Sequence, residues 1–292
     1  MPIVILLLCA CKTVPTPEKM PVSALEAGKI EGSGIHKVVL FYHLSVRNLE
    51  TTPMTMAIQN TKTTINGMEI DPQHAVLKTG GAELSGMHAT VTHWKTFEME
   101  LELHLDLNAY IEMEKNSIDE ELSQAYDADT FTAGLMFDIT YTYGSAEPLS
   151  DSVSAIKEFP RIREPVFTIT SIAILQAELI NTRFSVNLRI DNPNPFPLTL
   201  SSFKYELYGH NLYWADGIEK NVLAIPAKSA AETRLFLIMN FINMKRSLLD
   251  QIIAMRNVNY RFTGTADVGT DISWMPQFAI KFDRSGFSEV LR

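Results

Sequence analysis

Histidines and glutamates in the first half of the chain are the side chains that could bind a metal ion. His88 and His93 are five residues apart, which places them on opposite faces of any strand. His104 lies further on, next to a row of like charges at Glu98, Glu100 and Glu102. Such a row, with no loop oxygens beside it, is a poor calcium site. We therefore expect solvated side chains here and no metal site.

Serine and lysine motifs are the next candidates for chemistry. Ser154-Ala-Ile-Lys157 matches Ser-x-x-Lys, and Lys78-Thr79-Gly80 matches Lys-Thr-Gly, two elements that serve in penicillin-recognising serine enzymes. Their order along this chain is reversed, and the Ser-Asp-Asn element is missing. The sequence also contains no Gly-x-Ser-x-Gly, no His-Glu-x-x-His and no phosphate-binding glycine loop. It predicts no catalytic residue and no cofactor, and therefore a protein that is not an enzyme.

Cys11 is the residue whose surroundings indicate a specific modification. An apolar run from Ile3 leads into Leu8-Cys9-Ala10-Cys11 and then into a polar stretch that contains prolines. This resembles the lipobox of bacterial lipoprotein signal peptides, in which the cysteine becomes acylated, by palmitate among other acyl chains, and forms the mature N-terminus. Ala10 fits the small residue before that cysteine, whereas Cys9 would follow a leucine. We expect residues 1–11 to be such a signal peptide.

The anchor implied by Cys11 predicts a location. Several acyl chains hold a protein stably on a membrane, and Lys12 after the cysteine favours the outer membrane, so we expect a cell-envelope protein that faces the periplasm. Met1-Pro2 supplies no basic residue and the apolar run is short, so we expect translation to start further upstream. Residues 12–35 contain several prolines and glycines and are expected to form a flexible tether.

Length, composition and charge limit the remaining choices. A chain of 292 residues with 46% hydrophobic residues is long enough for two domains. Up to Pro165 there are 12 Lys and Arg against 23 Asp and Glu, and after it 13 against 11. An acidic first half without a basic cluster argues against a nucleic-acid partner. After the first ten residues, no apolar run approaches the roughly 18–20 residues that cross a bilayer.

Most of the chain has the alternation of β-strands. Residues 96–107 place Phe97 and five further apolar residues on one face and the acidic row with His104 on the other. Helical spacing occurs twice, at 109–126 and 245–255. The prediction is an all-β fold with two short helices, built as tandem immunoglobulin- or fibronectin-like β-sandwich domains. Further strands are expected at 38–46, 134–143, 184–190, 203–208, 234–241, 260–266 and 278–282.

The two halves of the chain share a pattern. Val46-Arg47-Asn48 followed by Pro53-Met-Thr-Met56 parallels Ile190-Asp191-Asn192 followed by Pro197-Leu-Thr-Leu200. The same order of strands and a helix follows each, which favours a repeat. We place the first domain at 36–163 and the second at 164–292.

One motif in the second half points to a family. Asn192-Pro193-Asn194-Pro195, preceded by an alternating strand, resembles the hallmark of the late embryogenesis abundant type-2 family, also called the water-stress and hypersensitive-response (WHy) domain. Proline removes a strand donor and asparagine stabilises turns, so the motif ends one strand and turns the chain into the next. The resemblance covers residues 166–290 and is weaker over 36–165. It implies a β-sandwich, a role in stress protection and no catalytic residues.

An apolar surface is the remaining candidate site. The strand at 234–241 is apolar on both faces, so Phe236, Ile238 and Phe241, together with Trp214, could contact an apolar partner or ligand. The neighbouring domain or helix could equally cover this strand.

Two functions of different class follow from these observations. The first is a membrane-anchored, non-catalytic lipoprotein that acts as a stress-protective or interaction module of the cell envelope. The second is a carrier of lipid or another hydrophobic ligand. The expected partners are the membrane and a lipid or envelope protein; an enclosed apolar cavity would favour the carrier, and a filled core the protective module.

Overall fold

The computed structural model of the chain describes residues 19–84, 88–116, 128–176, 181–240 and 256–291. The chain divides into two compact units, Met1–Pro160 and Arg161–Arg292, called here the first and the second unit. The sequence placed the division at 163/164, a few residues later. Each unit is described by itself below.

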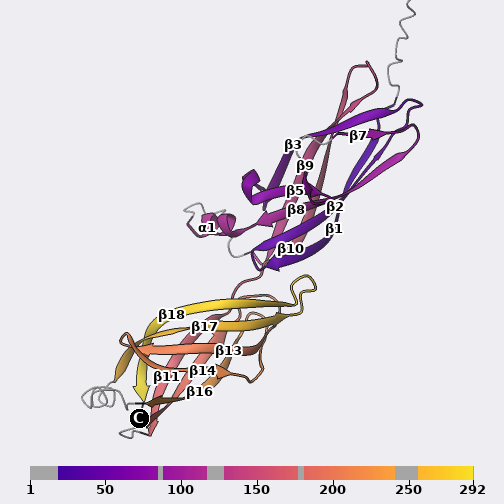
Figure 1. The fold of residues 1–292 in the computed structure, drawn as a ribbon. Helices are drawn as coiled ribbons and strands as arrows, with labels where there is room; N and C mark the ends of the chain where they lie inside the picture. The colour runs from indigo at the N-terminus through magenta and orange to yellow at the C-terminus, as the bar shows by residue number, and fades with distance from the viewer. Residues whose placement is uncertain (1–18, 85–87, 117–127, 177–180, 241–255, 292) are drawn as a thin grey trace, which may run out of the picture. The chain divides into compact units, whose positions relative to one another are not determined.

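The first unit consists of two sheets (Figure 1). One sheet has the strand order β1 (Val22–Gly34), β2 (Lys37–Arg47), β8 (Thr96–Asp106), β5 (Ala75–Thr79) and β6 (Ala82–Glu83). The other has the order β10 (Leu149–Pro160), β9 (Thr130–Thr142), β3 (Met54–Ile65) and β4 (Met68–Glu69), with β7 (His88–Val91) also paired to β3. A 3-10 turn, η1 (Pro72–His74), precedes β5, and helix α1 (Asn108–Asn116) follows β8.

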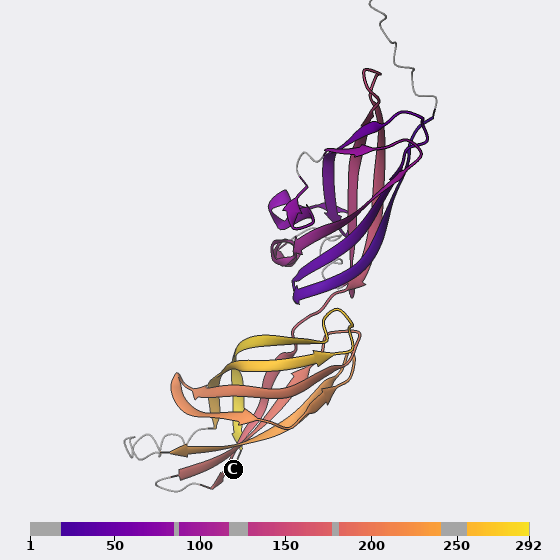
Figure 2. The ribbon, with the colours of Figure 1, turned by 45° about the vertical axis from the view of Figure 1, so that its right-hand side comes forward.

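The second unit repeats this strand order in two layers, as Figure 2 shows. One layer contains β11 (Val166–Gln176), β12 (Asn181–Asp191) and β16 (Ala230–Asn240). The other contains β18 (Gln277–Leu291), β17 (Asn257–Thr270), β13 (Leu198–Gly209) and β14 (Leu212–Glu219), with β15 (Leu223–Ile225) paired to β13. A short parallel pairing of β11 with β18, at Ile172–Val290 and Ala173–Leu291, joins the layers at one edge.

Each strand of the second unit therefore has a counterpart in the first. β1, β2 and β8 occupy the places of β11, β12 and β16, and β10, β9, β3 and β4 those of β18, β17, β13 and β14. The first unit has an addition: β5 pairs with the free edge of β8. In the part of the chain that the structure describes, β16 pairs with β12 alone.

Alternating apolar residues produce these sheets. In β8 the side chains of Leu101, Leu103 and Leu105 are buried, while Glu102 and His104 between them are half-exposed. One face of each strand therefore packs on the opposite sheet, which is the arrangement that a period of two predicts. The all-β, sandwich-like prediction is confirmed.

Aromatic rings fill the space between the layers of the second unit. Phe167 of β11 stacks on Phe282 of β18 with ring centroids 4.3 Å apart, and Phe282 stacks on Phe262 of β17 at 5.2 Å. Gly264 makes room for this cluster, because a Cβ atom there would lie 2.7 Å from Cζ of Phe282 and 2.0 Å from the carbonyl oxygen of Lys204. The glycine is thus required by packing.

The flexible tether expected over 12–35 is wrong from Val22 to Gly34. This segment is β1, which pairs along β2 from Val22–Arg47 to Gly34–Lys37. Its hydrogen bonds are made by the backbone, so a glycine-rich sequence can still form an edge strand. Lys157 of β10 also donates to the carbonyl oxygen of Gly28 at 2.6 Å, which fixes β1 to the other sheet.

Helices and strand lengths differ from expectation in three places. The predicted helix at 109–126 is observed as α1 over Asn108–Asn116, and the rest of it lies outside the described residues. The predicted helix at 245–255 also lies outside them. The strand predicted at 278–282 extends over Gln277–Leu291, because β17 pairs with it from Gly269–Gln277 to Asn257–Glu289.

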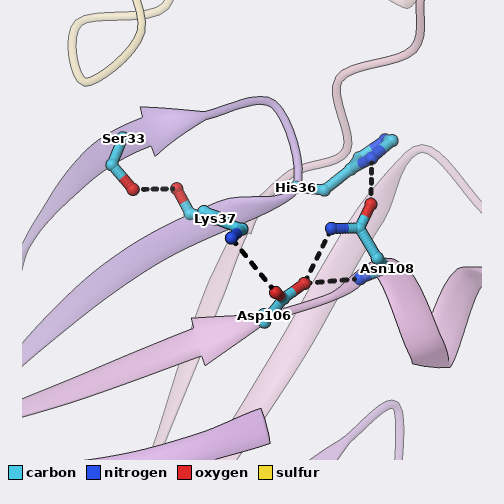
Figure 3. A network of polar contacts seen from close by, with 5 residues as sticks. All are labelled: Ser33, His36, Lys37, Asp106 and Asn108. Carbon is cyan, nitrogen blue, oxygen red and sulfur yellow. Dashed lines mark hydrogen bonds and ion pairs between the residues drawn. The ribbon is translucent and has the colours of Figure 1, made fainter.

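A polar network joins β2, β8 and α1 at one end of the first unit (Figure 3). Asp106 accepts hydrogen bonds from the backbone N–H of Asn108 at 3.1 Å and from its side chain at 2.8 Å, and Lys37 Nζ lies 3.4 Å away. His36 Nδ1 contacts Oδ1 of Asn108 at 2.9 Å. Burial acts to raise the pKa of Asp106, but the hydrogen bonds from Asn108 and Lys37 hold this pKa below its ordinary value.

This network predicts how the first unit responds to acid. A carboxylate whose pKa is lowered by folding stabilises the folded state at pH values above its ordinary pKa of 3.8. This contribution is lost as the pH falls through the lower pKa of the folded state. We expect Asp106→Asn to destabilise the first unit at neutral pH and to match the wild type in strong acid. Urea unfolding midpoints over a pH series measure this; a difference that stays constant with pH would contradict it.

Candidate functional site

The Asn-Pro-Asn-Pro motif forms the turn that takes the chain from β12 in one layer to β13 in the other. Its asparagines are buried, at 2% exposure for Asn192 and 0% for Asn194, whereas Pro195 is exposed and Pro193 half-exposed. A turn between layers leaves backbone groups without strand partners, and these must be satisfied in another way. The two asparagine side chains do this.

Asn192 binds backbone groups on three sides of the turn. Its Nδ2 donates to the carbonyl oxygens of Phe196 at 2.8 Å and Pro226 at 3.0 Å, and more weakly to that of Ile225 at 3.4 Å. Its Oδ1 accepts from the backbone N–H of Asn194 at 2.9 Å. One side chain therefore connects the end of β12, the turn and the segment after β15.

Asn194 ties the entry of the second unit to the same turn. Its Nδ2 donates to the carbonyl oxygen of Arg163 at 2.8 Å, and its Oδ1 accepts from the N–H of Arg163 at 2.7 Å. Its own carbonyl accepts from the N–H of Lys228 at 2.9 Å. The motif thus holds three chain segments together, which gives it a structural role.

The first unit has the same arrangement around Asn48, which is fully buried. Its Nδ2 donates to the carbonyl oxygens of Thr52 at 2.8 Å and Val91 at 3.2 Å, and its Oδ1 accepts from the N–H of Glu50 at 2.9 Å. Asn48 and Asn192 therefore bind equivalent backbone groups. These are the carbonyl four residues further along the chain, the carbonyl at the end of the short strand β7 or β15, and the N–H two residues further along. The prolines absent from this turn are therefore not needed for the bonds.

Tyr143 supplies a bond in the first unit that Asn194 supplies in the second. The hydroxyl of Tyr143 donates to Oδ1 of Asn48 at 3.2 Å, where the second unit has Nδ2 of Asn194 on Oδ1 of Asn192 at 2.9 Å. Burial, with smaller contributions from Glu50 and Tyr141, raises the pKa of Tyr143 to about 12. The hydroxyl therefore keeps its proton and remains a donor across the physiological range.

Phe236 and Ile238 lie on the outer face of β16. They are 69% and 60% exposed, while Leu235 and Leu237, which alternate with them, are buried. The strand is thus apolar on both faces as predicted, but its outer face is open to solvent among the described residues. Exposed apolar side chains grouped on one face mark contact surfaces more often than chance exposure does.

Glu102 and His104 occupy the matching positions in the first unit. Ser185 of β12 pairs with Phe236, and Phe41 at the same place in β2 pairs with Glu102. Nε2 of His104 contacts Oε2 of Glu102 at 3.1 Å. The same outer row is therefore polar in one unit and apolar in the other.

Trp214 does not lie with Phe236 and Ile238 on the outer face of β16. It is 4% exposed and its ring stacks on Phe184 inside the sandwich at 5.6 Å. The ring lies over Gly209, where a Cβ atom would be 2.1 Å from it, so packing in the core determines its place. Phe241 lies outside the described residues, as does Cys11.

The motifs considered for chemistry are not brought together. Ser154 and Lys157 are three residues apart on β10 and so point to opposite faces. Lys78 lies on β5, in the other sheet. His88 and His104 likewise lie on strands of different sheets. Within the described ranges, no cluster of three His, Cys, Asp or Glu could hold a metal ion.

None of the helices in the described part of the chain has the length and apolar character needed to cross a bilayer.

Sequence reasoning missed several exposed apolar residues at strand ends. Leu175, Phe287 and Leu291 are 55%, 63% and 49% exposed, yet none was singled out. Phe287 and Leu291 lie beyond the strand predicted at 278–282. The continued alternation after Phe282 was the signal that could have found them, and strand pairing was needed to place Leu291 beside β11.

Replacing Asn192 with alanine should destabilise the second unit by about 2–3 kcal/mol, because buried carbonyl groups would lose their donor. Asn221→Ala is the matched control; this asparagine is exposed, and its loss should cost about 0.5 kcal/mol or less. Hydrogen exchange followed by mass spectrometry measures the change in each unit separately. Equal effects of the two substitutions, or faster exchange confined to the first unit, would refute the structural role of Asn192.

Solved structures with detectable likeness to the chain include three of different kind. A protein from Archaeoglobus fulgidus is 14% identical, with a TM-score of 0.26, 44% of this chain and 96% of that chain covered. A bacterial adhesin from Mobiluncus mulieris is 8% identical, with a TM-score of 0.29 and coverage of 93% and 98%. Red sea bream transglutaminase is 11% identical, with a TM-score of 0.23 and coverage of 93% and 32%.

Comparison by sequence points to a family. A search of curated proteins finds no match. The family model described as late embryogenesis abundant protein matches residues 187–286, which run from β12 to β18 and include the Asn-Pro-Asn-Pro turn. This match supports the late embryogenesis abundant type-2 family for residues 187–286 of the second unit, as the asparagine motif indicated.

Proposed function

We propose that the protein is a membrane-anchored, non-catalytic lipoprotein that acts as a stress-protective or interaction module of the bacterial cell envelope. The observation that carries the proposal is the combination of two features in one chain. These are the lipobox-like sequence Leu8-Cys9-Ala10-Cys11 and the family match over 187–286. The first supports attachment to a membrane, and the second supports a stress-related domain.

The described residues support a binding role. The side chains that sequence motifs offered for catalysis are separated by the fold, with Ser154 and Lys157 on opposite faces of β10. The polar side chains of the Asn-Pro-Asn-Pro turn, Asn192 and Asn194, hydrogen-bond to the backbone. Phe236 and Ile238 are exposed on the outer face of β16 and available for contact with a partner.

The location follows from the same anchor. Lys12 directly after Cys11 supports sorting to the outer membrane, with both units facing the periplasm. An acylated N-terminus would keep them near the membrane surface, where a protective module of the envelope would act.

A carrier of lipid or another hydrophobic ligand is the second candidate, favoured by the exposure of Phe236 and Ile238. Between the layers of the second unit, the stacked rings of Phe167, Phe262 and Phe282 occupy the space that an enclosed acyl chain would need. This favours the protective module. Native mass spectrometry of the full chain carrying Cys11→Ser separates the two candidates, because a carrier would retain a stoichiometric lipid that organic extraction identifies.

The anchor is tested by Cys11→Ser in bacteria that express the full chain. The substitution removes the thiol that would form the thioether to the diacylglyceryl group. The variant should therefore lose labelling by radioactive palmitate and move from the membrane fraction to the supernatant. Cys9→Ser is the matched control and should leave both properties unchanged. Palmitate labelling that persists in the Cys11→Ser variant would exclude attachment at this residue.

A further inference from the structure

Exposed apolar side chains gather at one end of the second unit, opposite the Asn-Pro-Asn-Pro turn. We call this group the apolar end. Its members are large, are between 41% and 69% exposed, and lie in the second half of β11, β16 or β18 or at the start of β14: Leu175, Leu212, Phe236, Ile238, Phe287 and Leu291.

Strand pairing brings these residues to the same end. Leu291 of β18 pairs with Ala173 of β11, two residues before Leu175. Arg183 of β12 pairs with both Gln176 of β11 and Ile238 of β16. These pairs place the ends of β11, β16 and β18 next to the start of β12.

The turn from β13 to β14 lies at the same end. Gly209 pairs with Leu212 on one side and with Tyr260 of β17 on the other. Tyr260 in turn pairs with Gly286, next to Phe287. Figure 2 shows the C-terminal end of the chain at this end of the unit.

The first unit shows that the fold itself does not require this apolar character. At the positions of Phe236 and Ile238 it has Glu102 and His104, which contact each other at 3.1 Å. The end of its β8 is part of the polar network around Asp106 (Figure 3). Exposing two apolar side chains to water is unfavourable, so their presence calls for a partner that covers them.

Charge at the apolar end indicates which partner fits. Arg183 and Arg256 are exposed there, and the carbonyl of Arg256 accepts from the N–H of Val290, next to Leu291. Glu289 is the exposed carboxylate on the same stretch of β18. Guanidinium groups bind phosphate oxygens through paired hydrogen bonds, and aromatic and aliphatic side chains enter the region just below lipid headgroups.

We propose that the apolar end of the second unit docks onto the surface of a bilayer that contains anionic phospholipid. Phe236 and Ile238 enter the headgroup region, and Arg183, which pairs with Ile238 and is exposed beside it, meets the phosphates. The proposal rests on the proposed membrane location, since that location brings the domain within reach of a bilayer, and it deepens it by naming the partner of this surface.

The shape of the surface favours a bilayer over a peptide strand. Phe236 and Ile238 project from the face of β16, and a strand that adds to a sheet pairs with its edge. Arg183 of β12 pairs with Ile238 and is exposed beside it, so the outer face of β12 and β16 presents apolar and cationic side chains together to a planar partner.

The test measures binding of the full chain carrying Cys11→Ser, which cannot be acylated there, to sedimented vesicles of phosphatidylethanolamine and phosphatidylglycerol. Binding should be detectable and should weaken with salt. The double substitution Phe236→Glu and Ile238→His installs the residues found at the matching positions of the first unit. It should weaken binding at least about tenfold, because two apolar side chains no longer enter the membrane.

Val222→Glu is the matched control, since Val222 is 68% exposed and lies in the turn before β15, at the opposite end of the second unit. It should bind as the parent chain does. Circular dichroism verifies folding; if the double variant is unfolded, the single substitution Ile238→His replaces it and should also weaken binding.

Three results would overturn the proposal. They are failure of the parent chain to bind these vesicles, an equal loss in the Val222→Glu variant, and a folded double variant that loses self-association but not vesicle binding. The last result would assign the surface to a second copy of the chain. None of these depends on acylation at Cys11, so they are distinguishable from a failure of the proposed anchor.

Discussion

A buried asparagine at the change of sheet is the interaction on which each unit depends. β2 and β3, like β12 and β13, lie in different layers, so the chain between them cannot satisfy its backbone groups by strand pairing. Asn48 and Asn192 satisfy these groups with their side chains. Nδ2 of each donates to the carbonyl four residues further along the chain and to a carbonyl at the end of a distant short strand, and Oδ1 accepts from the N–H two residues further along. The layers are thereby fixed to each other at one end.

The same framework carries different outer surfaces in the two units. Where the first unit pairs Glu102 with His104, the second exposes Phe236 and Ile238. The first unit also pairs β5 with the edge of β8, while the described part of the second adds no strand beside β16. Interior packing constrains inward-facing residues, and the outward row is free to vary. Differences in function between the units are therefore expected on this face.

The interior of the second unit bears on the two candidate functions. Phe167, Phe262 and Phe282 stack between the layers, and Gly264 is required because a side chain there would collide with Phe282 and the backbone of β13. A close-packed interior gains stability from contacts that a ligand would have to displace. Binding is therefore better placed on the outer surface, where Phe236 lies.

Local sequence determined the strands, the sandwich class and the Asn-Pro-Asn-Pro turn, because alternation and turn chemistry act between neighbouring residues. It could not identify the partners of Asn192 and Asn194, such as Pro226 and Arg163, since these lie some thirty residues away along the chain. For the same reason it could not separate Trp214, which packing on Phe184 buries, from the exposed Phe236 and Ile238. It also interpreted Val22–Gly34 as a tether, although pairing with β2 makes it a strand. Only the tertiary structure brought together the six residues of the apolar end, because strand register decides which chain ends become neighbours.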